Sequence, residues 1–187
     1  ANPAVCTATA HGLSNGDVIE VTSGWGRLNK RVFEVSGVTT NTFELEGMDT
    51  SSTSFFPAGT GTGTVREVTA WTQLTKVMNP STQGGDPKTV NYKFVESDVE
   101  YSINDGFTAT SYTLEFDDDD TTAGYTAMRT LTDAQTNTVM KMLMRSGAIV
   151  YLPCTLAMND VPRLQDGQIN RISAQFAGVN RHTRYAA

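Results

Sequence analysis

Tyr112-Thr-Leu-Glu-Phe-Asp117 alternates large apolar side chains with polar ones, and this alternation decides the fold class. Side chains two residues apart share one face of a β-strand, so the stretch predicts a strand with one buried and one solvent-exposed face. The same alternation recurs at residues 42–45, 90–94 and 168–176. Charged residues make up only 18% of the chain, which also favours strands and turns over long helices. The sequence therefore predicts a mainly β protein with a β-sandwich or barrel core.

The chain divides into two regions by pattern. Residues 1–68 have short apolar runs between Gly- and Asn-rich turns and predict a small N-terminal β-module. Residues 69–187 predict a larger core of longer strands, and the Gly-Thr repeat at residues 59–64 favours a boundary near residue 68. Within the core region, the Gly- and Pro-rich residues 79–88 predict an extended, exposed loop.

One segment predicts a helix. Thr132-Asp-Ala-Gln135 fits a capping box, in which a Thr and a Gln three residues later satisfy free backbone N–H groups. Apolar residues follow at helical spacing: Val139, Met140, Leu143 and Met144. We expect one helix near residues 132–146, flanking the sheet, and then a buried strand at residues 148–152 that Pro153 ends.

Charge is distributed unevenly along the chain. The formal net charge of −6 argues against a protein that binds nucleic acid by neutralising its phosphates. Acidic residues concentrate in two groups of candidates for an acidic patch: Glu96, Asp98, Glu100, Glu115, Asp117, Asp118, Asp119 and Asp120. Residues 154–187 have the opposite bias, with Arg163, Arg171, Arg181 and Arg184 against two aspartates. This asymmetry either pairs unlike surfaces of neighbouring copies head to tail or reflects chance clustering of surface charge.

The sequence lacks the common catalytic motifs. It contains no Gly-x-Ser-x-Gly, phosphate-binding loop, His-Glu-x-x-His or Cys-x-x-Cys pattern. A hydrolase that uses Glu96, Asp98 and Glu100 is a weak alternative, because a shared strand face does not separate their pKa values. We expect no enzymatic activity and no cofactor.

Metal ligation and covalent cross-links are not expected either. His11 and His182 are isolated, and a structural or solvated role is expected for each. The run at residues 117–120 lacks the spacing of a calcium loop and predicts a solvated turn. Cys6 and Cys154 are expected to be free thiols.

No apolar run long enough for a membrane span and no secretory signal occurs in the chain. The chain begins at Ala1 without a methionine, so a leading segment is expected to have been removed or left out.

Part of the sequence resembles known proteins. Ala8-Thr-Ala-His-Gly-Leu-Ser-Asn-Gly-Asp-Val18, with Phe33-Glu-Val35 and Asn41-Thr-Phe-Glu-Leu45, resembles a β-module that recurs in phage tail proteins. From Trp71 to Gly178-Val-Asn-Arg181, the order of strands and helix is similar to that of the tail tube proteins of siphophages, the phages with long non-contractile tails. The chain thus resembles the major tail tube protein family, with the N-terminal module as a decoration or part of the ring contact.

The resemblance implies a structural role. Six copies are expected to close into a ring around a continuous β-barrel, and rings to stack into a tube in the virion tail after assembly in the cytoplasm of a bacterial host. Partners implied are further copies of the chain, a tape measure protein, and tail-tip or terminator proteins. DNA is expected to pass through the lumen without specific binding, because lumen carboxylates repel phosphates. Lumen candidates are the polar strand faces near residues 91–93 and 113–117; candidates for contacts between rings are Asn79, Gln83, Asp86 and Lys88.

Two other functions remain open at this stage. One is a carbohydrate- or surface-binding β-sandwich, in which Trp25, Trp71 and the tyrosines supply stacking platforms on a monomer. The other is a different tail component such as a tail terminator, which shares the fold and caps a tube without stacking indefinitely.

Overall fold

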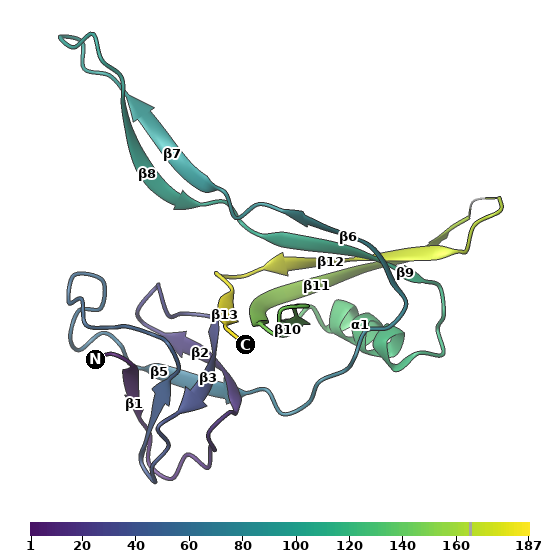
Figure 1. Ribbon diagram of the computed structural model, residues 1–187, viewed down its shortest axis with the longest axis horizontal. Helices are drawn as coiled ribbons and strands as arrows, with labels where there is room; N and C mark the ends of the chain where they lie inside the picture. The colour runs from purple at the N-terminus through teal and green to yellow at the C-terminus, as the bar shows by residue number, and fades with distance from the viewer. Residues whose placement is uncertain (165) are drawn as a thin grey trace.

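The computed structural model describes residues 1–164 and 166–187, and it confirms the mainly β class with one flanking helix. Among these residues there are three antiparallel sheets of five, six and two strands (Figure 1). We call them the N-terminal sheet, the core sheet and the arm.

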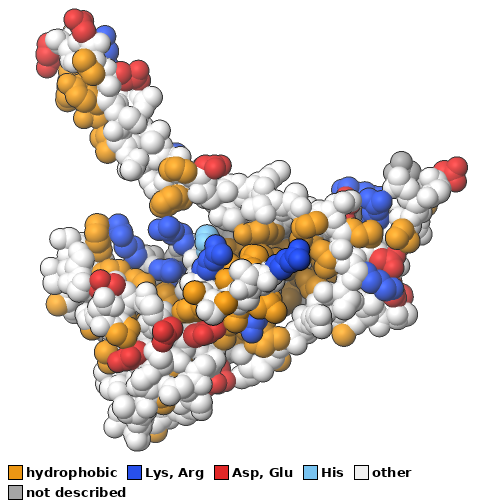
Figure 2. All heavy atoms as spheres, viewed as in Figure 1, with side chains coloured by type: hydrophobic (Ala, Val, Ile, Leu, Met, Phe, Trp, Pro, Cys, Tyr) orange, Lys and Arg blue, Asp and Glu red, His pale blue; other side chains and the backbone are white. Residues whose placement is uncertain are grey.

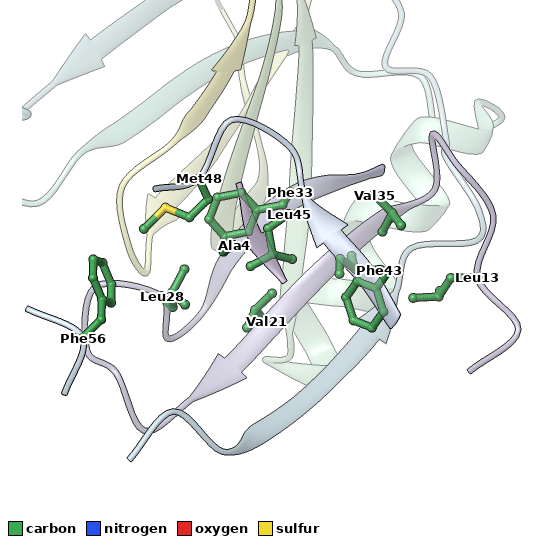
Figure 3. Close-up of a cluster of buried hydrophobic side chains, with 11 residues drawn as sticks. Ala4, Leu13, Val21, Leu28, Phe33, Val35, Phe43, Leu45, Met48 and Phe56 are labelled. Carbon is green, nitrogen blue, oxygen red and sulfur yellow. The ribbon is translucent and has the colours of Figure 1, made fainter. Parts of the chain in front are cut away.

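The N-terminal sheet comprises the first five strands of the chain, in the order β1-β4-β3-β2-β5. Its strands are β1 (Ala4–Thr7), β2 (Val18–Ser23), β3 (Arg31–Ser36), β4 (Thr42–Leu45) and β5 (Gly63–Glu67). Alternation along β3 and β4 directs Phe33, Phe43 and Leu45 into one apolar cluster, where Phe56 from the following loop also packs (Figure 3). This cluster gives residues 4–67 a core of their own.

The core sheet has the strand order β10-β11-β12-β9-β6, with β13 also paired to β11. Its strands are β6 (Val77–Gln83), β9 (Ser111–Asp117), β10 (Asn137–Leu143), β11 (Ile149–Arg163), β12 (Arg171–Gly178) and β13 (Thr183–Tyr185). The helix α1 (Ala123–Ala134) covers one face. Leu114, Phe116, Ile172 and Phe176 pack on that face with Met128 of α1.

The arm is a hairpin of β7 (Pro87–Tyr92) and β8 (Tyr101–Phe107) that projects away from both larger sheets (Figure 1). It continues the direction of β6 and β9, which lead into it and out of it. Every residue of β7 and β8 is exposed, including Tyr92, Ile103 and Phe107. The arm therefore adds no core to the single chain.

The N-terminal sheet contacts the core sheet through a small shared cluster. Tyr151 of β11 is buried against Val18 and Val32. Its Oη donates a 2.8 Å hydrogen bond to the Glu34 carboxylate, and the Tyr185 Oη accepts from the Glu34 N–H at 3.0 Å. Desolvation, and then the nearby Glu34 carboxylate, raises the pKa of Tyr151. Desolvation also raises the pKa of Tyr185, to about 12.

The helix prediction near residues 132–146 is wrong in position. The helix is α1, which ends at Ala134, and the centre of the predicted segment is strand β10. Gln135 has a left-handed backbone (φ 49°) and its N–H donates to the Leu131 carbonyl, so it ends a helix instead of completing a capping box. The apolar residues around Met140 fit both periods, and antiparallel pairing with β11 along all of β10 decides for a strand.

Two further expectations are corrected. Residues 79–88 are not one loop, because β6 extends to Gln83 and β7 begins at Pro87. Pro153 does not end its strand, since β11 continues to Arg163. The backbone of Pro153 faces the gap between the end of β12 and the start of β13, where its carbonyl accepts from the Val179 N–H at 2.9 Å. No strand of the described chain lies in this gap, so no ladder hydrogen bond requires the backbone N–H that proline lacks.

Candidate assembly surfaces

The face of the core sheet opposite α1 is polar. In the β9–β12 register, Glu115 lies opposite Ser173, and Thr113 lies opposite Gln175. These side chains alternate with the buried ones that face α1, and the neighbouring β11 residues Ala157 and Asn159 are exposed. We call this surface the polar face; it consists mainly of small hydroxyl and amide side chains.

The acid at the centre of the polar face is paired within the chain. Glu115 accepts hydrogen bonds from the Asn79 Nδ2 at 2.8 Å, the Arg163 Nη1 at 3.3 Å and the Arg171 Nη1 at 3.4 Å. These contacts, that of Asn79 first, lower the pKa of Glu115. Arg163 and Arg171, both predicted to contact a neighbouring copy, therefore serve an internal carboxylate in the single chain.

The acidic run before α1 is also partly neutralised. The Lys76 Nζ lies 3.2 Å from the Asp117 carboxylate and 2.7 Å from that of Asp119. Lys76, together with the Thr121 hydroxyl and N–H, lowers the pKa of Asp119 to about 2. Asp118 and Asp120 take part in no ion pair within the described chain. No three His, Cys, Asp or Glu side chains of the described residues are grouped to hold a metal.

The other three predicted acids lie elsewhere. Glu96, Asp98 and Glu100 are at the tip of the arm, residues 93–100, where Figure 2 shows acidic side chains far from the rest of the molecule. The predicted acidic patch is thus divided between the arm tip and the region around Glu115. At the base of the tip, the rings of Tyr92 and Tyr101 stack with centroids 5.5 Å apart.

The candidates for contacts between rings are spread along β6 and β7. Asn79 binds Glu115, and Gln83 is the last residue of β6. Asp86 lies in the short link between β6 and β7, where its carbonyl accepts from the Thr108 N–H at 2.9 Å. Lys88 forms a 2.9 Å ion pair with Asp105 across the arm.

The remaining predicted basic residues, Arg181 and Arg184, lie at the C-terminal end of the chain near the N-terminal sheet. Arg184 is exposed on β13, and the Arg181 guanidinium lies 4.4 Å from the centre of the Phe107 ring at the base of the arm. Two arginines that were not among the predicted candidates, Arg27 and Arg31, line the same recess as Arg181. About 150 residues separate them from Arg181, so no local pattern signals their approach.

The core sheet has two outer strands, β6 and β10, within the described chain. The backbone groups on their outer sides have no strand partner there, which makes both edges candidates for pairing with another copy. Beside β10, a recess of about 980 Å³ lies between α1 and residues 70–77. Leu143 at the end of β10 is 73% exposed, so this edge is apolar as well as open.

The tryptophans do not form a shared platform. The Trp25 ring packs edge-on against Phe56, and its Nε1 donates to the Pro57 carbonyl at 2.9 Å. Trp71 lies instead beside Tyr151, with ring centroids 5.9 Å apart. This separation weighs against a carbohydrate site that stacks a sugar on both rings.

The chain is similar to a known protein family and to a solved structure. A family model described as phage tail tube protein matches residues 23–187. No curated protein matches. A solved structure of the tail of an empty GTA particle, computed with helical refinement and C6 symmetry, is 11% identical with a TM-score of 0.48, over 59% of this chain and 83% of that one.

No helix among the described residues is long and apolar enough to cross a membrane.

Proposed function

Because the chain belongs to the phage tail tube protein family, we propose that its copies close into rings and that the rings stack into the wall of a tail tube. Its role is structural, and its place is the virion tail. The arrangement of the core sheet supports the ring most directly, because this sheet has one covered face, one polar face and two open edges.

Ring closure would pair the open edges of neighbouring copies. β6 of one copy lies beside β10 of the next, so the core sheets join into one continuous barrel. Closure removes the exposed edges and covers apolar residues such as Leu143. Six copies per ring is the number that the tail tube resemblance implies.

The polar face would line the lumen, with α1 on the outside. Hydroxyl and amide groups such as those of Thr113, Ser173 and Gln175 give DNA no strong attachment. Because two arginines already neutralise Glu115, Asp118 and Asp120 would supply most of the charge that repels phosphate. DNA would then slide along a weakly acidic wall.

The arm would carry contacts beyond its own ring. An isolated chain leaves Phe94, Val95 and Ile103 exposed at 53%, 102% and 56%, on an element without a core. Exposed apolar patches of this kind mark interaction surfaces. Docking on another copy would bury them.

Electron microscopy of the purified protein tests this function. Negatively stained samples across a concentration series are expected to show hollow tubes or stacked rings with sixfold end views. Single rings that never stack would indicate a tail terminator. A chain that stays monomeric at the highest concentration and binds glycans would contradict the tube and favour the binding module.

A further inference from the structure

A recess of about 530 Å³ separates the N-terminal sheet from the base of the arm. Three arginines from different parts of the chain line it: Arg27 after β2, Arg31 at the start of β3, and Arg181 before β13. Figure 2 shows Lys and Arg side chains gathered along this side of the molecule. We call the recess the basic notch; it is cationic although the whole chain is acidic.

The three guanidinium groups have no anionic partner among the described residues. Arg27 lies 3.5 Å from the centre of the Phe55 ring, and Arg181 lies over Phe107. No carboxylate of the described residues forms an ion pair with either of them or with Arg31. Asp49, the acid that lines the notch, instead accepts from the Ser51 N–H at 2.8 Å.

Of the three arginines, Arg31 has the least satisfied hydrogen-bonding groups. It is half-buried and donates only to the Thr183 Oγ1 at 3.3 Å and the Met48 Sδ at 3.5 Å, while its buried Nε has no acceptor among the described residues. Burial, and then repulsion by Arg181, lowers its pKa. A half-buried cation without a carboxylate is costly, and an incoming anion would offset that cost.

The notch therefore selects a partner that combines carboxylates with apolar side chains. Its cations would take the carboxylates, and the exposed Phe55 and Phe107 rings would take the apolar groups. The arm tip has this composition. Its acids Glu96, Asp98 and Glu100 alternate with apolar and small side chains, and Val99 is 60% exposed.

The tip cannot reach the notch of its own chain. Gly106 and Phe107 at the arm base line the notch, and the tip lies at the opposite end of the hairpin (Figure 1). β7 and β8 have six and seven residues, a length of about 20 Å at ~3.3 Å per residue. Tip and notch can meet only between two copies.

We propose that the arm tip of one copy binds the basic notch of a second copy, with Glu96, Asp98 and Glu100 facing Arg27, Arg31 and Arg181. The contact joins unlike surfaces, so each copy offers one tip and one notch and all copies are joined with the same polarity. Charge complementarity of this kind sets the orientation of docking. The inference rests on the proposed self-assembly and names the surface that accepts the arm.

Charge reversal tests the contact. In the full chain, E96K/D98K and R27E/R181E are each expected to raise the concentration for half-assembly about tenfold, by sedimentation velocity. Combining all four substitutions is expected to return the concentration for half-assembly to within about threefold of that of the unsubstituted chain, because the reversed charges attract again.

D133K/D160K, which reverses two exposed acids outside tip and notch, is the matched control and should assemble like the unsubstituted chain. Arg27 and Arg181 are exposed, so R27E/R181E should fold, as circular dichroism will confirm.

A disulfide test locates the contact directly. In a Cys6→Ser background, a D98C copy mixed with an R27C copy should form an intermolecular disulfide, whereas D160C mixed with R27C should not. Buried Cys154 does not compete.

The remaining outcomes distinguish failure of the tip–notch contact from failure of the tail tube. If the unsubstituted chain assembles and neither reversal weakens assembly, or the combination fails to restore it, the tip–notch contact is overturned while the tube stands. If the chain never assembles and the D98C–R27C disulfide is absent, both fail. Binding of inorganic phosphate or short duplex DNA that R27E/R181E abolishes, with no effect of E96K/D98K on assembly, would assign the notch to phosphates and overturn the contact.

Discussion

At the scale of single residues, charge pairing governs how the acidic side chains act. Glu20 is only 4% exposed, and the Arg66 Nε donates to its carboxylate at 2.9 Å. Lys30 Nζ is more distant, at 4.0 Å from the other carboxylate oxygen, which has no hydrogen bond of its own in the described chain. Arg66 is therefore the main partner of a buried charge.

Removing this partner should destabilise the N-terminal sheet. We expect Arg66→Ala to lower the free energy of unfolding by about 2 kcal/mol, because the Glu20 carboxylate is left buried without its charged donor. Urea denaturation measures the change. Arg145→Ala, which removes an exposed arginine, is the control and should be near neutral. Equal stabilities of the two variants would show that Glu20 does not depend on Arg66.

The Lys76–Asp119 pair makes stability depend on acid pH. Lys76, and then Thr121, holds the pKa of Asp119 at about 2, below its ordinary 3.8, so the pair stabilises the fold above pH 3.8 and this contribution is lost as the pH falls to about 2. Lys76→Met should raise the pKa of Asp119 in an NMR carboxyl titration and make the loss of stability from pH 4 to pH 2 shallower. Lys88→Met, which breaks the distant pair with Asp105, should leave the Asp119 titration unchanged.

At the scale of elements, a capping side chain marks the start of α1, although the capping-box pattern at residues 132–135 lies at the end of the helix and predicted its start wrongly. The Thr122 Oγ1 accepts from the Tyr125 N–H at 3.3 Å, which satisfies one free donor at the start of α1. Glycine favours the left-handed conformation at the other end, but Gln135 adopts it here. The end of α1 thus depends on tertiary context more than on its own residue type.

Thr122→Ala tests the helix start. Loss of the capping oxygen is expected to lower the free energy of unfolding by about 1 kcal/mol. Thr130→Ala lies inside α1 on its exposed side and should raise helix propensity, with no loss of stability beyond a few tenths of a kcal/mol. Chemical denaturation compares the two, and an equal effect of both would argue against Thr122 as the cap.

At the scale of the whole molecule, we propose that the arm contacts other copies, because its strands are exposed and add no core to their own chain. If residues 88–106 are replaced by an Asn-Gly turn, Pro87 and Phe107 still pair and the core sheet keeps all its contacts. The shortened chain should melt within a few degrees of the full chain and fail to form tubes. Thermal unfolding and electron microscopy measure the two properties, and normal tubes without an arm would contradict its role.

The division of the chain at residue 68 stays a prediction that proteolysis tests. Residues 69–76, which precede β6, are mostly exposed and belong to no strand or helix, so a protease should cut there first. The two fragments should remain together on size exclusion, because Tyr151 and Tyr185 bind the N-terminal sheet. Fragments that separate without denaturant would show that this contact is too weak to join them.

Sequence periodicity determined the mainly β class and several of the strands. Period-2 patterns at Thr42–Leu45 and Ser111–Asp117 arise from burial of one face, which each strand carries locally. The failure near Met140 has a physical cause: its neighbours fit either period, and only pairing with β11 makes the segment a strand. The family resemblance came from motifs within residues 8–45 and from the order of strands and helix after Trp71, and a family model that matches residues 23–187 confirms it.

What tertiary structure alone decided is which charges meet. Composition showed an acidic stretch and a basic end, but the fold places Arg163 and Arg171 on Glu115 and brings Arg27 and Arg31 beside Arg181. It also carries Glu96 away from Glu115, because the arm extends the sheet outward. Periodicity acts over neighbouring residues and can be read along a chain, whereas ion pairs depend on distance in space, which only the folded backbone sets.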